Sequence, residues 1–200
     1  MQAQDIIALQ KQVQQERFSS IHAPVTYING KRYHFIEQEV PVARIIINLP
    51  REFKDMPDNL AKLKYPSEER PQQIKTSHDL TINFAFKLLQ VEVPEQELIH
   101  SMDTMLDAMK RVYPQNTYLE TGVNSFRTDR NRTYCWFEYY GPTLDIEAYS
   151  FNATMLLYGK PLYVLFNCPK EEYEKWHPIV FEAIETIRDK PVSWKGEGEK

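Results

Sequence analysis

The segment Leu80-Thr-Ile-Asn-Phe-Ala-Phe-Lys-Leu88 decides the fold class, because its large apolar side chains recur at every second position. In an extended strand, successive side chains point to opposite faces. One face therefore carries Ile82, Phe84, Phe86 and Leu88, and the other carries Thr81, Asn83, Ala85 and Lys87. This alternation is typical of an antiparallel strand that buries one face, and it predicts an antiparallel sheet.

More strands are predicted on the carboxyl-terminal side, where β-branched and aromatic residues are enriched. They span residues 118–126, 133–140, 143–151, 153–158 and 162–167, with turns at Gly141-Pro142 and Gly159-Lys160. Residues 134–140 place aromatic side chains on both faces of their strand. Either helices cover both sides of the sheet, or one aromatic face is exposed for a partner.

On the amino-terminal side, Asn29-Gly30 predicts a β-hairpin over residues 25–37, because this dipeptide readily adopts the positive φ angles of a type I′ turn. Residues 43–49 and 73–76 read as strands. A short helix is expected at residues 58–63 with Asp58 as its N-cap.

Two longer helices are predicted from apolar residues at three- and four-residue steps. The first begins at Pro94, and its stripe is Leu98, Met102, Met105, Leu106, Met109, Val112 and Tyr113. Core packing explains this methionine-rich stripe, and an adaptable binding groove is the alternative. The second helix is expected to have Pro169 as its first residue and Cys168 or Asn167 as its cap, and its stripe is Tyr173, Trp176, Val180, Ile184 and Ile187. Pro178 predicts a kink or a split of that helix near Trp176.

The predicted organisation is one α+β domain over residues 21–190, with a central antiparallel β-sheet flanked by helices. Residues 1–20 form an N-terminal helix appendage whose thin apolar stripe must dock on its own domain, on a partner or on a second copy. Residues 191–200 are expected to be a flexible polar tail.

Charge and composition narrow the possible partners. The chain has 24 Lys and Arg against 28 Asp and Glu, a formal charge of −4, which argues against nucleic acid. The basic run Arg127, Arg130 and Arg132 contains Asp129 and reads as a solvated turn. No secretory signal and no apolar run of about 20 residues is found, so we expect no membrane insertion and a cytoplasmic location. Cys135 and Cys168 are then free thiols.

No recognisable catalytic, cofactor-binding or metal-binding motif is found in the sequence. The glycines form no phosphate-binding loop, and G-x-S-x-G is missing. His100, Asp103 and Asp107 share one helical face and could hold a metal, but a solvated polar face explains them more simply. Asp145 and Glu147 lie two positions apart on one strand face, as a pair of glycosidase acids would, but solvent-facing alternation explains them more simply.

The loop at residues 64–71 is the predicted partner-binding site. Its two prolines predict an ordered loop that loses little entropy when it binds. Tyr65 and Arg70 are residue types that dominate interface energetics, and Glu68 accompanies them. In the alternative interpretation, Tyr65 fills the core and Arg70 pairs with a neighbouring acid.

The order of elements over residues 25–187 resembles the fold group shared by PsbP, the Ran-binding Mog proteins and a broad set of uncharacterised bacterial proteins. Arg44-Ile-Ile-Ile-Asn-Leu-Pro50, with Phe53 and Met56, looks like the opening strand and turn of that group. Residues 64–71 and the strand that follows them look like bacterial members, and residues 163–168 with the last helix look like the closing elements.

This resemblance implies a PsbP/Mog-like αβα arrangement and no catalysis, since the characterised members bind proteins. A distantly similar branch contains the Eag-type secretion adaptor chaperones, which hold hydrophobic helices of effectors. The binding residues of that branch cannot be matched here, so its function is not carried over.

The leading expectation is a cytoplasmic, non-enzymatic protein-binding module, an adaptor or chaperone, without a cofactor and with another protein as partner. A small-molecule-binding protein, or an enzyme whose pocket only the fold assembles, is the alternative. A structural subunit of a homo-oligomer is the third possibility.

Overall fold

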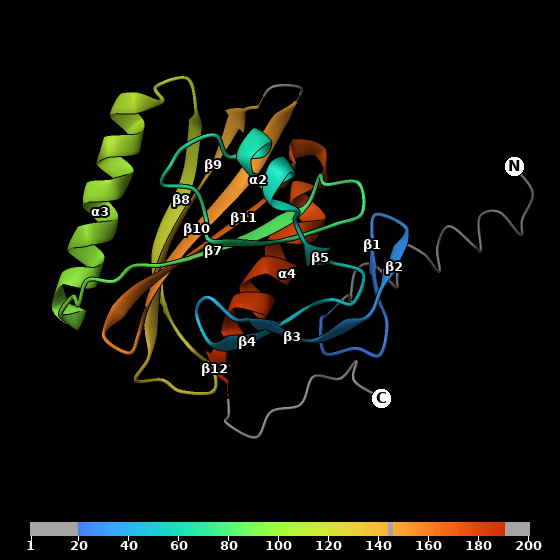
Figure 1. The fold of residues 1–200 in the computed structure, drawn as a ribbon, viewed down its shortest axis with the longest axis horizontal. Coiled ribbons are helices and arrows are strands. Elements are labelled where there is room, and N and C mark those ends of the chain that lie inside the picture. Colours follow the sequence, from blue (N-terminus) through green and yellow to red (C-terminus); the bar gives the residue numbers. More distant parts are fainter. Residues whose placement is uncertain (1–19, 144–145, 191–200) are drawn as a thin grey trace, which may run out of the picture. The chain divides into compact units, whose positions relative to one another are not determined.

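A computed structural model of the chain describes residues 20–143 and 146–190 (Figure 1). These residues pack into two compact units. The sheet unit contains Val40–Arg44 and Phe53–Tyr173. The α4 unit contains the described residues 20–39, 45–52 and 174–190. Whether the two units form one domain, as the sequence predicts, stays a prediction. The predicted N-terminal helix and the polar tail lie outside the described residues.

The sheet unit is built on a seven-stranded sheet in the order β5-β6-β7-β11-β10-β9-β8. Its strands are β5 (Lys54–Asp55), β6 (Gln73–Thr76), β7 (Asn83–Leu88), β8 (Thr117–Ser125), β9 (Thr133–Pro142), β10 (Glu147–Leu157) and β11 (Lys160–Pro169). Every neighbouring pair is antiparallel. The unit also contains helices α2 (Asp58–Lys64) and α3 (Glu95–Val112) and the 3-10 turn η1 (Lys170–Glu172). The predicted α+β class with a large antiparallel sheet is confirmed.

The hairpin of β10 and β11 corrects two sequence-based boundaries. β10 is one continuous strand rather than two, because Asn152 pairs with Phe137 on one side and Leu165 on the other. Gly141 and Pro142 do not form a turn; they extend β9 and pair with the start of β10. A turn does lie at the other end, one residue earlier than predicted: Tyr158 and Gly159 adopt positive φ angles, 53° and 75°, and Lys160 is the first residue of β11.

Both faces of the sheet are buried at its centre. In β9, Tyr134 and Trp136 on one face and Cys135 and Phe137 on the other are all buried, so neither aromatic face is free for a partner. In β7 the prediction of a single buried face is wrong, because Asn83 is fully buried on the second face, as is the neighbouring Ala85. Ala85 packs in the cluster beneath α2.

α3 covers part of one face of the sheet. Leu98, Met102 and Leu106 pack on Cys135 and Phe137, with Met105 and Met109 at the margin. The core interpretation of the methionine stripe is therefore confirmed, and Cys135 acts as a small apolar residue. Val112 and Tyr113 are 65% and 47% exposed, so the end of the predicted stripe is not core. Pro94 and Pro57 are the N-cap residues of α3 and α2, so Asp58 is the first helical residue of α2 and not its cap.

The α4 unit contains β1 (Thr26–Ile28), β2 (Lys31–Tyr33), β3 (Phe35–Val40), β4 (Ile45–Pro50), α4 (Tyr173–Glu185) and β12 (Arg188–Asp189). The Asn29-Gly30 turn is confirmed by φ angles of 50° and 72°. A three-stranded sheet has the order β12-β4-β3. The ring of Tyr33 meets Trp176 edge-on at 5.5 Å, and the Glu182 carboxylate accepts hydrogen bonds from the Ser20 hydroxyl and the Ile21 amide.

The predicted interruption at Pro178 does not split α4, which continues from Tyr173 to Glu185. Pro178 lies in the second turn of this helix, where the missing N–H affects only the hydrogen bond to the carbonyl of Glu174. No helix among the described residues is both long enough and apolar enough to cross a membrane.

We expect Phe84→Ala to lower the free energy of unfolding by about 3–5 kcal/mol, because it empties a fully buried site between Phe53 and Phe166. Chemical denaturation measures this loss. Leu63→Ala is the control, since Leu63 is 70% exposed and its truncation should cost less than about 0.5 kcal/mol. A loss below about 1 kcal/mol for Phe84→Ala would contradict the register of β7.

Both cysteines are free and buried, and burial raises the pKa of each thiol. We therefore expect a thiol reagent at neutral pH to modify the native protein slowly and to find two thiols per chain in denaturant. Fast modification of the folded protein would contradict the burial of Cys135 and Cys168.

Candidate functional site

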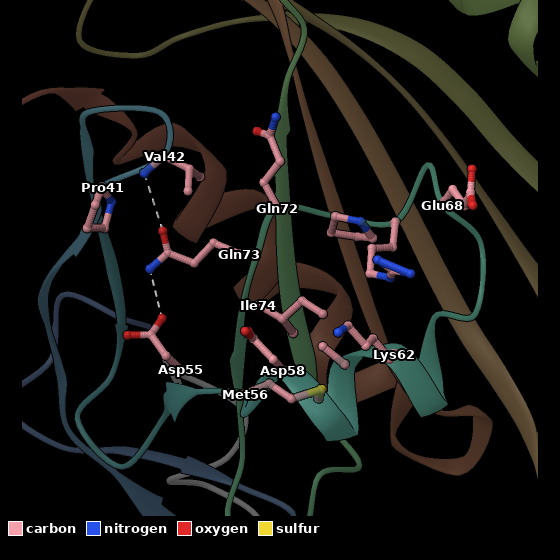
Figure 2. A pocket seen from close by; sticks show the side chains of 13 residues that line it. Pro41, Val42, Asp55, Met56, Asp58, Lys62, Glu68, Gln72, Gln73 and Ile74 are labelled. Carbon is pink, nitrogen blue, oxygen red and sulfur yellow. Dashed lines mark hydrogen bonds between the residues drawn. The ribbon is translucent and has the colours of Figure 1, made fainter.

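The candidate site is a hollow of about 550 Å³ beside α2, at the β5 edge of the sheet (Figure 2). We call it the α2 hollow. Met56, Ala61 and Ile74 supply apolar lining. Charged lining residues come from β5, α2 and the following loop, and they are Asp55, Asp58, Lys62, Glu68 and Arg70.

The position of α2 follows from where β5 stops. β5 pairs with β6 only at Lys54 and Asp55, and the Met56 amide then donates to the Ile74 carbonyl at 2.8 Å. Pro57 ends this pairing because it has no N–H, and α2 begins at the next residue. The helix packs on Met56, Ile74 and Ala85 through its partly buried residues Leu60 and Ala61.

Gln73 closes one side of the hollow by bridging two segments (Figure 2). Its Nε2 donates to Asp55 Oδ1 at 2.8 Å, and its Oε1 accepts the amide of Val42 at 3.5 Å. The other oxygen of Asp55 meets Lys75 Nζ at 3.0 Å. Lys75 is only 7% exposed, so this ion pair compensates a largely buried ammonium group.

Tyr65, the first predicted partner residue, points into the sheet and does not line the hollow. Its hydroxyl accepts a hydrogen bond from Asn167 Nδ2 at 2.9 Å. Asn167 Oδ1 accepts from Asn83 Nδ2, and Asn83 Oδ1 accepts from the Thr76 hydroxyl, each at 2.7 Å. The ring also packs on the apolar cluster below α2. Tyr65 thus fills the core, as the alternative interpretation proposed.

Glu68 and Arg70, the other two predicted residues, do line the hollow. Arg70 Nε donates to the Tyr65 carbonyl at 3.2 Å, and this bond takes the place of the acid partner that the alternative interpretation gave to Arg70. The side chain of the neighbouring Glu69 pairs with Lys87, and the Glu69 carbonyl accepts from the same ammonium group at 2.9 Å. The loop at residues 64–71 is therefore held by the bond from Arg70 to the Tyr65 carbonyl and by the contacts of Glu69 with Lys87.

The charge around the hollow is balanced. Asp55 is neutralised by Lys75, which leaves the acids Asp58 and Glu68 and the bases Lys62 and Arg70. A ligand that carries both signs of charge would match this lining better than a purely anionic or cationic one.

Metal-ligand geometry is missing from the part of the chain that the structure describes: no group of three His, Cys, Asp or Glu could hold an ion there. His100, Asp103 and Asp107 are exposed on α3. Glu147 pairs with Lys170 at 2.7 Å, and Asp145 lies outside the described residues.

A second polar feature was not predicted from the sequence. The Tyr149 hydroxyl donates to Glu138 Oε2 at 2.5 Å, and both residues are buried. Burial, followed by the bond to this carboxylate, raises the pKa of Tyr149. The available signal was a lone Glu inside the aromatic run 134–140, but its partner eleven residues away could not be read without the register of β9 and β10.

We expect Tyr65 to titrate late, because burial raises the pKa of its phenol to about 12. The phenol of an unfolded tyrosine ionises near pH 10. The neutral, buried phenol of Tyr65 therefore contributes fully to the free energy of unfolding below that pH, and this contribution is lost as the pH rises towards 12. The difference between the ultraviolet titrations of wild type and Tyr65→Phe isolates this group. A difference curve centred near pH 10 would contradict the buried position.

Comparisons with known proteins support the fold alone. No family model matches the chain, and no curated protein does. The cyanobacterial PsbP protein (CyanoP) of Synechocystis sp. PCC 6803 is similar in structure, with a TM-score of 0.57, 10% sequence identity and coverage of 78% of this chain and 92% of CyanoP. A Bacteroides thetaiotaomicron VPI-5482 structure gives a TM-score of 0.52 and 13% identity, covering 80% of this chain and 50% of the other. The chain therefore has a PsbP-like α+β fold.

Proposed function

We propose that this chain is a cytoplasmic, non-enzymatic protein-binding module, an adaptor or chaperone, whose partner inserts a segment into the α2 hollow. The observation that carries the proposal is the convergence of Glu68 and Arg70 with Asp58 and Lys62 around one hollow.

The lining is held in place before any partner arrives, which supports binding with little loss of entropy. Gln73 ties Asp55 to the Val42 amide, and Tyr65 anchors the start of the loop through Asn167. The end of the loop is held where Lys87 contacts Glu69. A rigid wall of this kind favours a preformed site over one that folds on binding.

The chemistry of the lining suggests the kind of segment that fits. An apolar side chain would rest on Met56 and Ile74, while an acidic group would face Lys62 or Arg70. A basic group on the same segment would face Asp58 or Glu68. Such a segment is amphipathic and carries both charges, and its binding should weaken as salt rises.

A small-molecule-binding protein is the second candidate, because about 550 Å³ lies within the usual size range of ligand pockets, roughly 300–1,000 Å³. A polypeptide is favoured because two acids and two bases line the hollow, which suits a segment with side chains of both charges. A bound polypeptide is much heavier than a bound small molecule, so the mass of the bound species distinguishes the two candidates.

The test is site-specific photo-crosslinking in the native cell, with a photoreactive phenylalanine analogue in place of Lys62. Lys62 is exposed on the wall of the hollow. Asp107 on α3 is the matched control, because it is also an exposed, charged helical position. We expect a discrete protein adduct at position 62 that is missing at position 107.

Arg70→Ala then separates fold from function. We expect an unchanged melting temperature and an affinity for the crosslinked partner about tenfold lower, with Arg111→Ala, an exposed arginine at the end of α3, as the control. A fall of several degrees in melting temperature would make Arg70 structural. Unchanged binding in Arg70→Ala, or equal adducts at both positions, would refute the α2 hollow as the partner site.

A further inference from the structure

The outer edge of β8 is a part of the sheet unit for which the sequence predicts no role. β8 is the last strand of the seven-stranded sheet, and its only strand neighbour among the described residues is β9 (Figure 1). Its nine residues run along this edge, from Thr117 to Ser125. A long edge strand presents unpaired backbone N–H and C=O groups, which are a template for pairing with another strand.

The two edges of the sheet differ in how they are protected. At the β5 edge, pairing stops after two residues, and α2 and the Gln73 bridge occupy the continuation. At the β8 edge, the protective features are one irregularity between Tyr118 and Thr121 and one charge, Glu120. The segment from Thr121 to Ser125 is regular and carries no charge.

β8 also extends beyond the cover that α3 provides. Cys135 and Phe137 of β9 are buried under α3. Val123 and Thr121 pair with these two residues and so share their face of the sheet, yet both are exposed, Val123 by 48%. Leu119, earlier in the strand, is 37% exposed. Within residues 20–143 and 146–190, the edge therefore combines backbone groups that no strand pairs with and uncovered apolar side chains.

We propose that a second copy of this chain pairs with the β8 edge, antiparallel and centred on Val123. In this register Val123 meets its own counterpart, Gly122 meets Asn124, and Thr121 meets Ser125. The central pair is then apolar and β-branched, each Thr121 opposes a Ser125 hydroxyl, and no like charges face each other, which suits an antiparallel ladder. The two sheets join into one continuous sheet.

Charge complementarity favours a second copy over a generic strand. The acidic residue Glu120 stands before the regular segment, and the turn that follows it is net basic, with Arg127 and Arg130 on either side of the single acid Asp129. An antiparallel two-fold arrangement brings Glu120 of each copy beside the basic turn of the other. A parallel arrangement would instead place like charges together.

The test measures self-association of the full chain. Sedimentation velocity between micromolar and several hundred micromolar protein should show a concentration-dependent dimer. Val123→Lys should weaken it by about tenfold, because two ammonium groups then meet on the two-fold axis. The exposed position tolerates lysine in the monomer, so the melting temperature of dilute protein should not change. Val112→Lys is the control, since Val112 is more exposed and lies outside the edge.

A cysteine variant tests the register directly. Opposite Cβ atoms in an antiparallel pair lie about 4.5–5.5 Å apart, close enough for a disulfide after a small adjustment. Under mild oxidation, Val123→Cys should crosslink into a dimer and Val112→Cys should not. The native cysteines are buried and do not compete.

Two results would overturn the proposal. One is a monomer at every concentration together with equal crosslinking of the two cysteine variants, as expected if β8 binds a different protein. The other is a dimer that Val123→Lys leaves intact, which would place the contact elsewhere. Neither result bears on the α2 hollow, because β8 and β5 are the opposite edges of the sheet.

Discussion

Burial of both faces of the seven-stranded sheet is the constraint on which the rest of the sheet unit depends. A strand with two buried faces has no solvent side for its polar residues, so a hydrogen-bond partner inside the protein offsets the cost of burying them. Asn83 and Glu138 show how this is done, the first between Thr76 and Asn167 and the second against Tyr149. These bonds link neighbouring strands and specify their register more tightly than apolar packing alone.

The same constraint explains why Tyr65 is not at the surface. Asn167 is the last amide in the row that begins at Thr76, and one of its N–H groups needs an acceptor. Tyr65 supplies that acceptor and fixes the end of α2 over the sheet. The position of the loop after α2, and with it the position of Arg70 at the hollow, is therefore a consequence of hydrogen bonding within the core.

The sequence predicted most elements of the fold because their signals are local. Asn29-Gly30 specifies its own turn, and the alternation in residues 82–88 needs no distant partner to be recognised. Errors arose where partners decide the outcome. Asn152 looked like a strand break, yet two flanking strands carry β10 through it, and Asn83 looked solvent-facing until its cross-strand neighbours were known. For the site, residue type pointed to Arg70 and Glu68 but could not show that Tyr65 turns inward, since Asn167 lies 102 residues away.

The division of the chain into interleaved units has a consequence for the order in which the protein is made. The long segment Phe53–Tyr173 contains every strand of the large sheet, so that sheet can assemble as soon as this segment leaves the ribosome. β4 must wait much longer for its carboxyl-terminal partners, because Ile46 pairs with Arg188 and the Asn48 amide donates to the Thr186 hydroxyl. During synthesis the apolar run 45–49 therefore lacks its carboxyl-terminal partners while some 140 later residues are translated, which leaves it open to aggregation in that interval.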